Sequence, residues 1–257
     1  MTNNTINAIL SLIEDNLEND LNIKSISCKT GYSSRHIQNI FKKHIGITPW
    51  KYIKHRRVTR AALLLRLTSS SIIDIAYRLQ FDSQQSFSRE FKKISGMTPF
   101  QYRNMKEWVF EPIFYQRAID VHQTVSPEVH KLNDGSIIGF DFFYEVDIKM
   151  GTKPFPLRWK LIEEQLSKTN GPVWLLSEYS FGEKSFDTTK VHTYIGIKDS
   201  DCPVMGQVCH YPSGYYIHFK KTGTIDEYMQ AVDNMYLKTL PNYKVKRKAG
   251  FDIEVIS

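Results

Sequence analysis

Two sets of polar side chains, placed fifty residues apart, have the chemistry needed to read the edges of DNA bases. Arginine forms bidentate hydrogen bonds with guanine, and asparagine or glutamine forms them with adenine. These residue types occupy the same relative positions in both sets: Arg35, Gln38 and Asn39, then Gln85, Ser88 and Arg89. Lysines suited to phosphate follow each set by about one helical turn: Lys42 and Lys43, then Lys92 and Lys93. A single such set would be read as an ordinary solvated helix surface, whereas two in the same register favour nucleic-acid binding.

The fifty-residue interval belongs to a wider internal repeat. Residues 41–50 recur as residues 91–100, with the same Phe-Lys-Lys start and the same Gly-x-Thr-Pro end. Glycine ends helices, and threonine followed by proline begins them, so one helix should end just after Ile45 and its counterpart just after Ser95. Two copies are too few for a solenoid, so the repeat predicts a duplicated small module.

Each copy is predicted to fold as a helix-turn-helix. An apolar stripe at helical spacing lies opposite each polar set: Ile37, Ile40, Phe41 and His44, then Phe87, Phe91 and Ile94. Short helices are expected just before, over residues 24–29 and 72–78, which gives the order of a helix-turn-helix unit.

One long helix over residues 49–66 is predicted to connect the copies. We expect four of its residues to face the core: Ile53, Val58, Ala61 and Leu65. Five basic residues would remain for solvent or phosphate: Lys51, Lys54, Arg56, Arg57 and Arg60. A rigid connector of this kind would let two reading helices enter successive major grooves, about 34 Å apart, from a single chain.

The positive charge is concentrated in the same part of the chain. Of the net charge of +7, residues 1–107 contribute +9 and residues 108–257 contribute −2. A basic N-terminal part joined to a nearly neutral C-terminal part predicts a polyanion-binding module followed by a second domain with a different task. We therefore place two domains at residues 1–107 and 108–257.

Composition excludes several other classes of protein. No apolar run is long enough to span a bilayer, and the first residues lack the pattern of a signal peptide, so we expect a soluble cytoplasmic protein with no membrane partner. Cys28, Cys202 and Cys209 have neither disulfide nor metal-site spacing. With no catalytic triad, phosphate loop or HExxH motif, the chain is predicted to be no enzyme and to have no catalytic residue, cofactor or metal site.

The first part of the chain resembles the DNA-binding domain of the AraC/XylS family, and within it the MarA/SoxS/Rob group. The resemblance rests on residues 31–43, Arg57, Ala61, Leu64, 75–76, 81–93, 96–99 and 102–103. It implies a transcription regulator, more specifically an activator, that binds double-stranded promoter DNA as a monomer and recruits RNA polymerase. It also implies DNA contacts by Arg35, Gln38, Asn39, Gln84, Gln85, Ser86, Ser88 and Arg89, with Ser86 on phosphate.

The sequence departs from that group at two places. In the first reading helix Arg35 and Asn39 stand where the group has Trp and Arg, so its half-site need not match theirs. Gln80 occupies the position before Phe81 where glycine is usual, which places a non-glycine residue in a turn that often needs positive φ.

Beyond Trp108 the apolar pattern changes to strand-like alternation. It predicts strands over 136–146, 172–179, 191–197, 213–221 and 250–256, and helices over 154–167 and 224–238. Two β-α-β halves result. The fold class is therefore multidomain, with an all-α domain of two helix-turn-helix units followed by an α+β domain around an antiparallel sheet.

The C-terminal part resembles the GyrI-like ligand-binding domain, most clearly at 215–219, 236–241 and 251–255. The resemblance implies a cleft between the halves for a small hydrophobic or cationic effector. Its residues would be Glu254 with Trp174, Tyr194, Tyr215 and Tyr216, since a carboxylate beside aromatic faces suits an organic cation. For the aromatic residues, ordinary core packing is an equal alternative.

Two further readings of the C-terminal domain remain open. It is a protein-interaction or sequestration module without a ligand, or it is a GyrI-like hydrolase of reactive small molecules. If no hydrophobic cation, bile-like acid or fatty acid shifts the melting temperature, the protein-interaction module is favoured. If the protein turns over a reactive ester and loses that activity when Glu254 is removed, the hydrolase is favoured.

Overall fold

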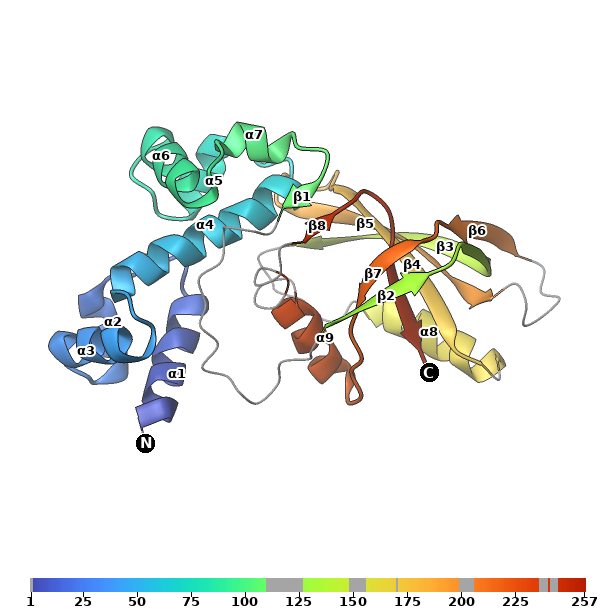
Figure 1. Ribbon diagram of the computed structural model, residues 1–257, viewed down its shortest axis with the longest axis horizontal. Coiled ribbons are helices and arrows are strands. Elements are labelled where there is room, and N and C mark those ends of the chain that lie inside the picture. The colour runs from blue at the N-terminus through green and yellow to red at the C-terminus, as the bar shows by residue number, and fades with distance from the viewer. Residues whose placement is uncertain are drawn as a thin grey trace. The chain divides into compact units, whose positions relative to one another are not determined.

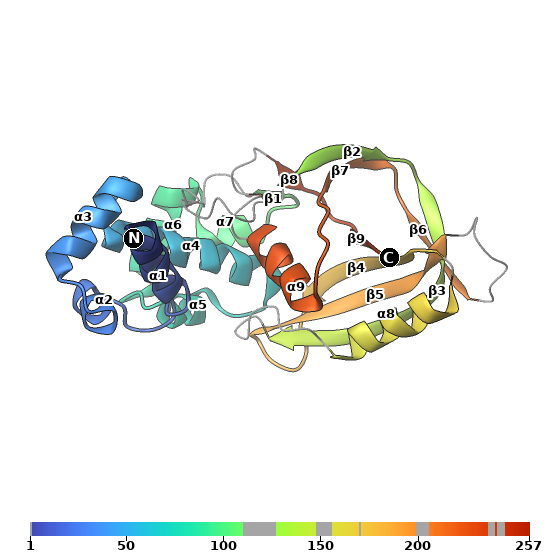
Figure 2. The ribbon, with the colours of Figure 1, turned by 90° about the horizontal axis from the view of Figure 1, so that it is seen from below.

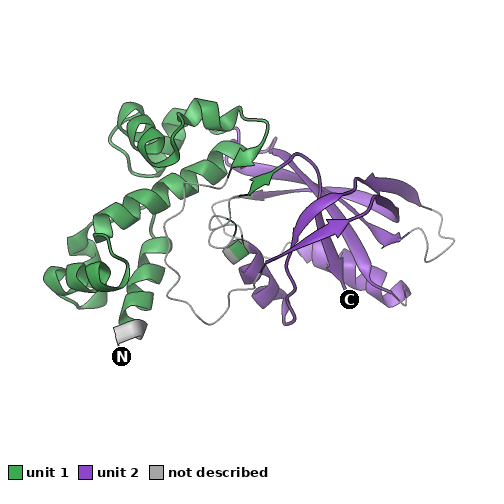
Figure 3. Cartoon of the chain, in the orientation of Figure 1, with its two compact units in different colours: residues 1–66, 70–124, 234–247 green, residues 67–69, 125–233, 248–257 purple. Residues whose placement is uncertain are grey.

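The computed structural model describes residues 2–109, 127–147, 156–169, 171–198, 206–235, 240 and 245–257. The chain forms two compact units (Figure 3). The described part of unit 1 lies within residues 1–66, 70–124 and 234–247, and that of unit 2 within residues 67–69, 125–233 and 248–257. Each unit has its own buried core.

Unit 1 is helical (Figure 1). Its helices are α1 Thr2–Glu14, α2 Ile23–Thr30, α3 Ser34–His44, α4 Pro49–Leu67, α5 Ile72–Arg78, α6 Gln84–Ser95 and α7 Pro99–Arg103. A two-residue strand β1, Trp108–Val109, pairs antiparallel with β8, Lys246–Arg247. These bounds confirm the two predicted helix-turn-helix units, α2–α3 and α5–α6, and the long connecting helix between them.

The two halves of unit 1 repeat the same aromatic contact against α4 and α7. Phe41 of α3 packs edge-on against Tyr52 of α4, with ring centroids 5.7 Å apart and planes at 70°. Fifty residues later Phe91 of α6 packs against Tyr102 of α7 at 5.5 Å and 69°. All four rings are buried, so the sequence repeat is also a repeat of core packing.

Matching caps fix the ends of the two reading helices. The Ser33 side chain accepts a hydrogen bond from the His36 amide at the start of α3, and Ser83 accepts one from the Ser86 amide at the start of α6. Such caps satisfy amides that have no partner within the helix. Beyond the helices, Gly46 and Gly96 adopt φ of 81° and 77°, a left-handed turn that glycine adopts without steric cost.

The structure corrects one expectation about α4. Arg56 and Arg57 are buried, with 2% and 3% of their surface exposed, and do not face solvent. Arg56 forms a bidentate ion pair with Glu14 of α1, from Nε to Oε1 at 2.7 Å and from Nη2 to Oε2 at 2.8 Å. Arg57 donates to the carbonyl oxygens of Leu17 and Asn19. Both halves of the unit pack on α4, so few of its faces remain for solvent.

Gln80 adopts the left-handed backbone conformation that its position implied, with φ of 59°. Its side chain donates from Nε2 to the Glu18 carbonyl oxygen at 2.9 Å. This contact ties the turn between α5 and α6 to the segment after α1, so Gln80 gains an interaction that glycine cannot make.

Unit 2 is built from antiparallel sheets. Its strands are β2 Glu128–Leu132, β3 Gly135–Asp147, β4 Val173–Phe181, β5 Thr188–Lys198, β6 Gln207–Tyr211, β7 Gly214–His218 and β9 Asp252–Ile256. Five of them form a sheet in the order β6-β3-β5-β4-β9, and β2 pairs separately with β7. The helices are α8 Pro156–Lys168 and α9 Ile225–Asn234.

The two faces of the five-stranded sheet pack against different partners (Figure 2). On one face Ile162 of α8 packs with Val173, Leu175 and Ile195. On the other face Leu132 of β2 packs against a cluster that contains Ile137, Leu176 and Tyr211. We call these the α8 face and the β2 face.

The antiparallel α+β prediction for this part of the chain is confirmed at the level of elements, with two additions. Strands β2 and β6 of unit 2 were not predicted, nor were the two-residue strands β1 and β8 of unit 1, and β7 is shorter than the predicted strand 213–221. Predicted helix residues 154–155 and 236–238 lie outside the described residues, as does Cys202. Cys28 and Cys209 are free thiols. Among the described helices, none combines the length and apolar character needed to cross a membrane.

Candidate nucleic-acid interface

The exposed face of α3 carries the first predicted reading set. Arg35, Gln38 and Asn39 are all exposed, while Ile37, Ile40 and Phe41 on the opposite side of the helix are buried. Lys42 and Lys43 extend the exposed face toward the end of the helix. The helix therefore presents amide and guanidinium donors over its first two turns and ammonium groups over its last.

The exposed face of α6 carries the second set in the same arrangement. Gln84, Gln85 and Arg89 are exposed, and Ser86 and Ser88 are partly exposed. Phe87 and Phe91 anchor the opposite side in the core. Lys92 and Lys93 again lie exposed at the end. The structure thus brings each predicted DNA-contacting set together on one helix face.

Several basic side chains of unit 1 form ion pairs with its own carboxylates. Arg60 and Arg78 both bind the Glu18 carboxylate, at 3.5 Å and 2.8 Å, and Lys54 lies 3.7 Å from Glu90. Burial acts against the charge of Arg56, but the adjacent Glu14 outweighs it and holds the pKa of that arginine above its ordinary value. The basic side chains exposed on α3 and α6 are thus the better candidates for phosphate.

Helix α4 contacts both reading helices: Tyr52 packs against Phe41 of α3, and Lys54 lies 3.7 Å from Glu90 of α6. Figure 1 shows α6 over the middle of α4. The helix has 19 residues, which corresponds to a length of about 28 Å at 1.5 Å per residue.

In unit 2 the predicted effector residues do not lie on one surface. Side chains alternate between the two faces of a strand, and residues in register across strands share a face. Glu254 is in register with Leu175 and therefore projects from the α8 face, whereas Trp174 and Tyr194 belong to the cluster on the β2 face. Tyr215 is 78% exposed on β7, and the Tyr216 hydroxyl donates to the Pro212 carbonyl oxygen.

Glu254 is engaged by two side chains on the α8 face. Arg158 of α8 donates from Nη2 to both carboxylate oxygens at 2.6 Å, and the Tyr228 hydroxyl of α9 donates to Oε2. Burial disfavours the charge of Arg158, but Glu254 outweighs it and raises the pKa of Arg158 above its ordinary value. Burial and the Glu254 charge together raise the pKa of Tyr228. The negative charge of Glu254 is therefore compensated from within unit 2.

The β2 face holds a group of polar residues that sequence reasoning did not select. The Oδ2 atom of Asp141 on β3 lies 2.8 Å from Nε2 of His192 on β5, within hydrogen-bonding distance. Exposed Glu178 of β4 is in register with His192. Burial, reinforced by neighbouring groups that include Asp141 and Glu178, raises the pKa of Tyr194. The sequence offered one signal for this group. Trp174, Leu176 and Glu178 are spaced two residues apart, which places their side chains on the same face of a strand.

Comparison with known proteins agrees with the geometry of unit 1. A family model described as a helix-turn-helix domain matches residues 14–105. The chain is 34% identical to the F1 operon positive regulatory protein of Yersinia pestis, over 98% of this chain and 82% of that protein. It is 30% identical to the right origin-binding protein of Escherichia coli strain K12, over 97% and 89%.

Among solved structures, a Chromobacterium violaceum transcriptional regulator described by its AraC-type DNA-binding domain is 33% identical. The match covers 38% of this chain and 88% of that one, with a TM-score of 0.38. The Yersinia pestis relative, which the match covers along most of its length, is named a regulatory protein and not an enzyme. From its paired helix-turn-helix units and these full-length relatives, the chain belongs to the AraC family of DNA-binding transcription regulators.

Proposed function

We propose that this regulator binds promoter DNA as a monomer, with α3 and α6 in successive major grooves. The observation that carries the proposal is the pair of exposed polar faces on α3 and α6, related by the fifty-residue repeat and joined through α4. A helix fits the major groove, and sites one turn apart lie on the same side of the duplex.

Each exposed side chain has a proposed role. Base edges are read by Arg35, Gln38, Asn39, Gln84, Gln85, Ser88 and Arg89. Phosphates are bound by Lys42, Lys43, Ser86, Lys92 and Lys93. Arg35 and Asn39 differ from the residues of the MarA/SoxS/Rob group, so α3 gives this protein its own half-site.

Selection of bound duplexes from a random pool tests the proposal. The expected product has two short conserved blocks about ten base pairs apart, bound by one chain per duplex. Isolation of a single block, or a stoichiometry of two chains per site, would contradict it. Sedimentation of the protein with the selected duplex measures the stoichiometry.

Activation of RNA polymerase is the proposed consequence of binding. The Yersinia pestis relative is named a positive regulatory protein, which supports this direction of control. Transcription in vitro from a promoter carrying the selected site should rise on addition of the protein. A fall in transcript on the same template would instead identify a repressor.

Residues 108–257 are proposed to form a GyrI-like regulatory domain in a cytoplasmic protein, with its effector site on the β2 face. Trp174 and Tyr194 supply partly buried aromatic surface there. Asp141 and Glu178 supply negative charge. A lipophilic cation matches that combination, through charge and cation–π attraction. The compensated charge of Glu254 makes it the weaker candidate.

A thermal-shift screen of hydrophobic cations, bile-like acids and fatty acids tests the effector site. Glu178→Gln should weaken cation binding, while Lys131→Gln, an exposed change on β2, should not. Equal cation binding by wild type and Glu178→Gln removes this carboxylate from the site. If no compound shifts the melting temperature, unit 2 serves a protein partner.

A further inference from the structure

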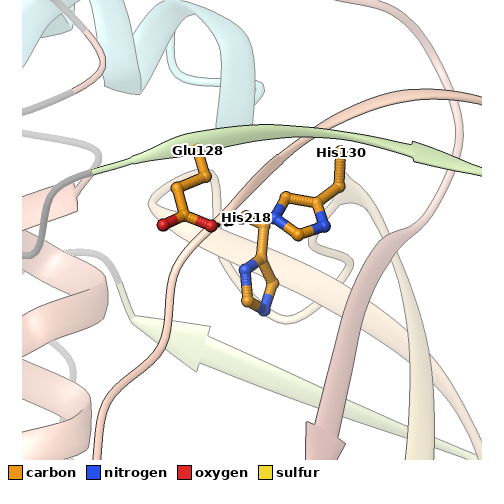
Figure 4. Close-up of side chains that lie close together, drawn as sticks. All are labelled: Glu128, His130 and His218. Carbon is orange, nitrogen blue, oxygen red and sulfur yellow. Dashed lines mark hydrogen bonds and ion pairs between the residues drawn. The ribbon is translucent and has the colours of Figure 1, made fainter.

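Three side chains with metal-binding chemistry meet at one end of the β2–β7 ladder. Glu128 and His130 of β2 and His218 of β7 each offer a ligand atom, and these atoms all lie within 4.8 Å of one another (Figure 4). All three side chains are exposed. This cluster lies on different residues from the aromatic and acidic group proposed for the effector.

Strand register explains why the three residues meet. Glu128 is paired with His218 across the antiparallel ladder, and His130 follows Glu128 by two residues. Residues two apart on a strand point to the same face, and paired residues share that face. The backbone of β2 and β7 therefore places all three side chains together, whatever their exact rotamers.

The side chains are already in mutual contact. His130 Nε2 lies 2.9 Å from Glu128 Oε2, and the rings of His130 and His218 have centroids 4.7 Å apart. In a tetrahedral zinc site with metal–ligand bonds near 2.1 Å, neighbouring ligand atoms are about 3.4 Å apart. Changes in side-chain rotamer, without movement of the strands, bring the cluster to that geometry.

The ligand set indicates which ions fit. Two imidazoles and one carboxylate suit zinc and other first-row divalent ions, whereas magnesium and calcium prefer sites built from oxygen alone. Three protein ligands leave a fourth position for water.

We propose that Glu128, His130 and His218 form a binding site for Zn²⁺ or a related transition-metal ion, with one coordination position open to solvent. The bound ion joins the first residue of β2 to the last residue of β7. It thereby clamps one end of a two-stranded sheet that is separate from the five-stranded sheet. An ion that binds only the folded form raises the melting temperature, by an amount that grows with the logarithm of the ratio of ion concentration to Kd.

The test is a titration of the full chain, without a polyhistidine tag and freed of metal by chelation. Zn²⁺ should bind one to one by calorimetry and raise the melting temperature, and Ca²⁺ and Mg²⁺ should do neither at the same concentrations. Co²⁺ in place of Zn²⁺ should give the visible absorption of a four- or five-coordinate ion bound by nitrogen and oxygen.

Variants assign the ion to these residues. His130→Ala and His218→Ala should each weaken Zn²⁺ binding at least tenfold, and Glu128→Gln should weaken it as well. His210→Ala on β6 and Cys28→Ser on α2 are matched controls, because both residues are exposed in the structure and lie outside the cluster. Circular dichroism and DNA binding of each variant verify that it is folded.

Two results would overturn the proposal. One is absence of Zn²⁺ binding by the wild-type chain at submillimolar concentrations. The other is Zn²⁺ binding by His130→Ala/His218→Ala that equals wild-type binding, or that falls no further than in the controls.

Discussion

The Arg158 guanidinium and the Glu254 carboxylate form a nearly buried ion pair that joins α8 to β9, with 7% and 20% of the two side chains exposed. A buried charge is tolerated when a partner of opposite sign compensates it. Tyr228 adds a third member from α9, so the pair connects three elements of unit 2.

Glu254→Gln should destabilise unit 2, because it leaves the Arg158 charge buried and uncompensated. We expect a loss of about 3 kcal/mol in the free energy of unfolding. Urea denaturation followed by tryptophan fluorescence measures it. The double variant Arg158→Met/Glu254→Leu should recover most of the loss. Because Glu254→Gln is expected to be less stable, its effector binding must be measured at a temperature where the variant is folded.

The two reading helices should control separate half-sites. Arg89→Ala should cost about 1–3 kcal/mol at one base position and relax specificity there, and Asn39→Ala should do the same in the other half-site. Binding to a panel of single-base variants of the selected duplex locates each effect. If Arg89→Ala and Asn39→Ala change preference in the same half-site, the assignment of one helix to each groove is wrong.

Substitution of exposed and of buried basic residues of unit 1 should change the salt dependence of DNA binding differently. Lys42→Ala should reduce the slope of log K against log salt by about 0.9, because one phosphate contact is lost. Arg57→Ala should lower stability instead, since it leaves the carbonyl oxygens of Leu17 and Asn19 without their donor. For folded Arg57→Ala the salt slope should equal that of wild type. A reduced slope would mean that this arginine reaches DNA.

The left-handed backbone at Gln80 predicts an order of stability among substitutions. Gln80→Ala loses the hydrogen bond to the Glu18 carbonyl and keeps the unfavourable φ. Gln80→Gly loses the same bond but removes the steric cost, which is about 1 kcal/mol or more. Thermal denaturation should find Gln80→Gly more stable than Gln80→Ala by about that amount. The reverse order would show that the turn has a negative φ in solution.

His55 should make unit 1 less stable in mild acid. Burial and the charge of Lys51 lower the pKa of His55, and Glu90 opposes them only in part. The unfolded chain thus binds a proton that the folded chain resists, so stability falls as the pH drops through about 6.5 and is unaffected above it. His55→Gln should reduce that loss in urea denaturation between about pH 7.5 and 5.5.

Local signals made the helix-turn-helix units predictable from sequence. Gly46, Gly96 and the Thr-Pro pairs are short-range signals whose effect on the backbone is the same in any fold. The exposure of the proposed reading sets was also predictable, because helical spacing alone places them opposite the apolar stripes.

Burial and pairing over long distances were not predictable in this way. Helix α4 is covered on several sides, so the assumption of one apolar and one polar face failed at Arg56 and Arg57. The face on which Glu254 lies depends on its register with Leu175, which no local pattern encodes. The cluster of Glu128, His130 and His218 joins β2 to β7, strands far apart in the chain, so motif spacing gave no sign of it.

The continuous helix α4 also restricts how this protein can change. Each residue added to an α-helix rotates everything beyond it by about 100° and advances it by about 1.5 Å. In the proposed mode of binding, a single insertion in α4 would therefore turn α6 away from the side of the duplex that α3 faces. The proposed mode of binding therefore makes half-site spacing a fixed property of the scaffold and leaves promoter preference to the side chains on the two exposed faces.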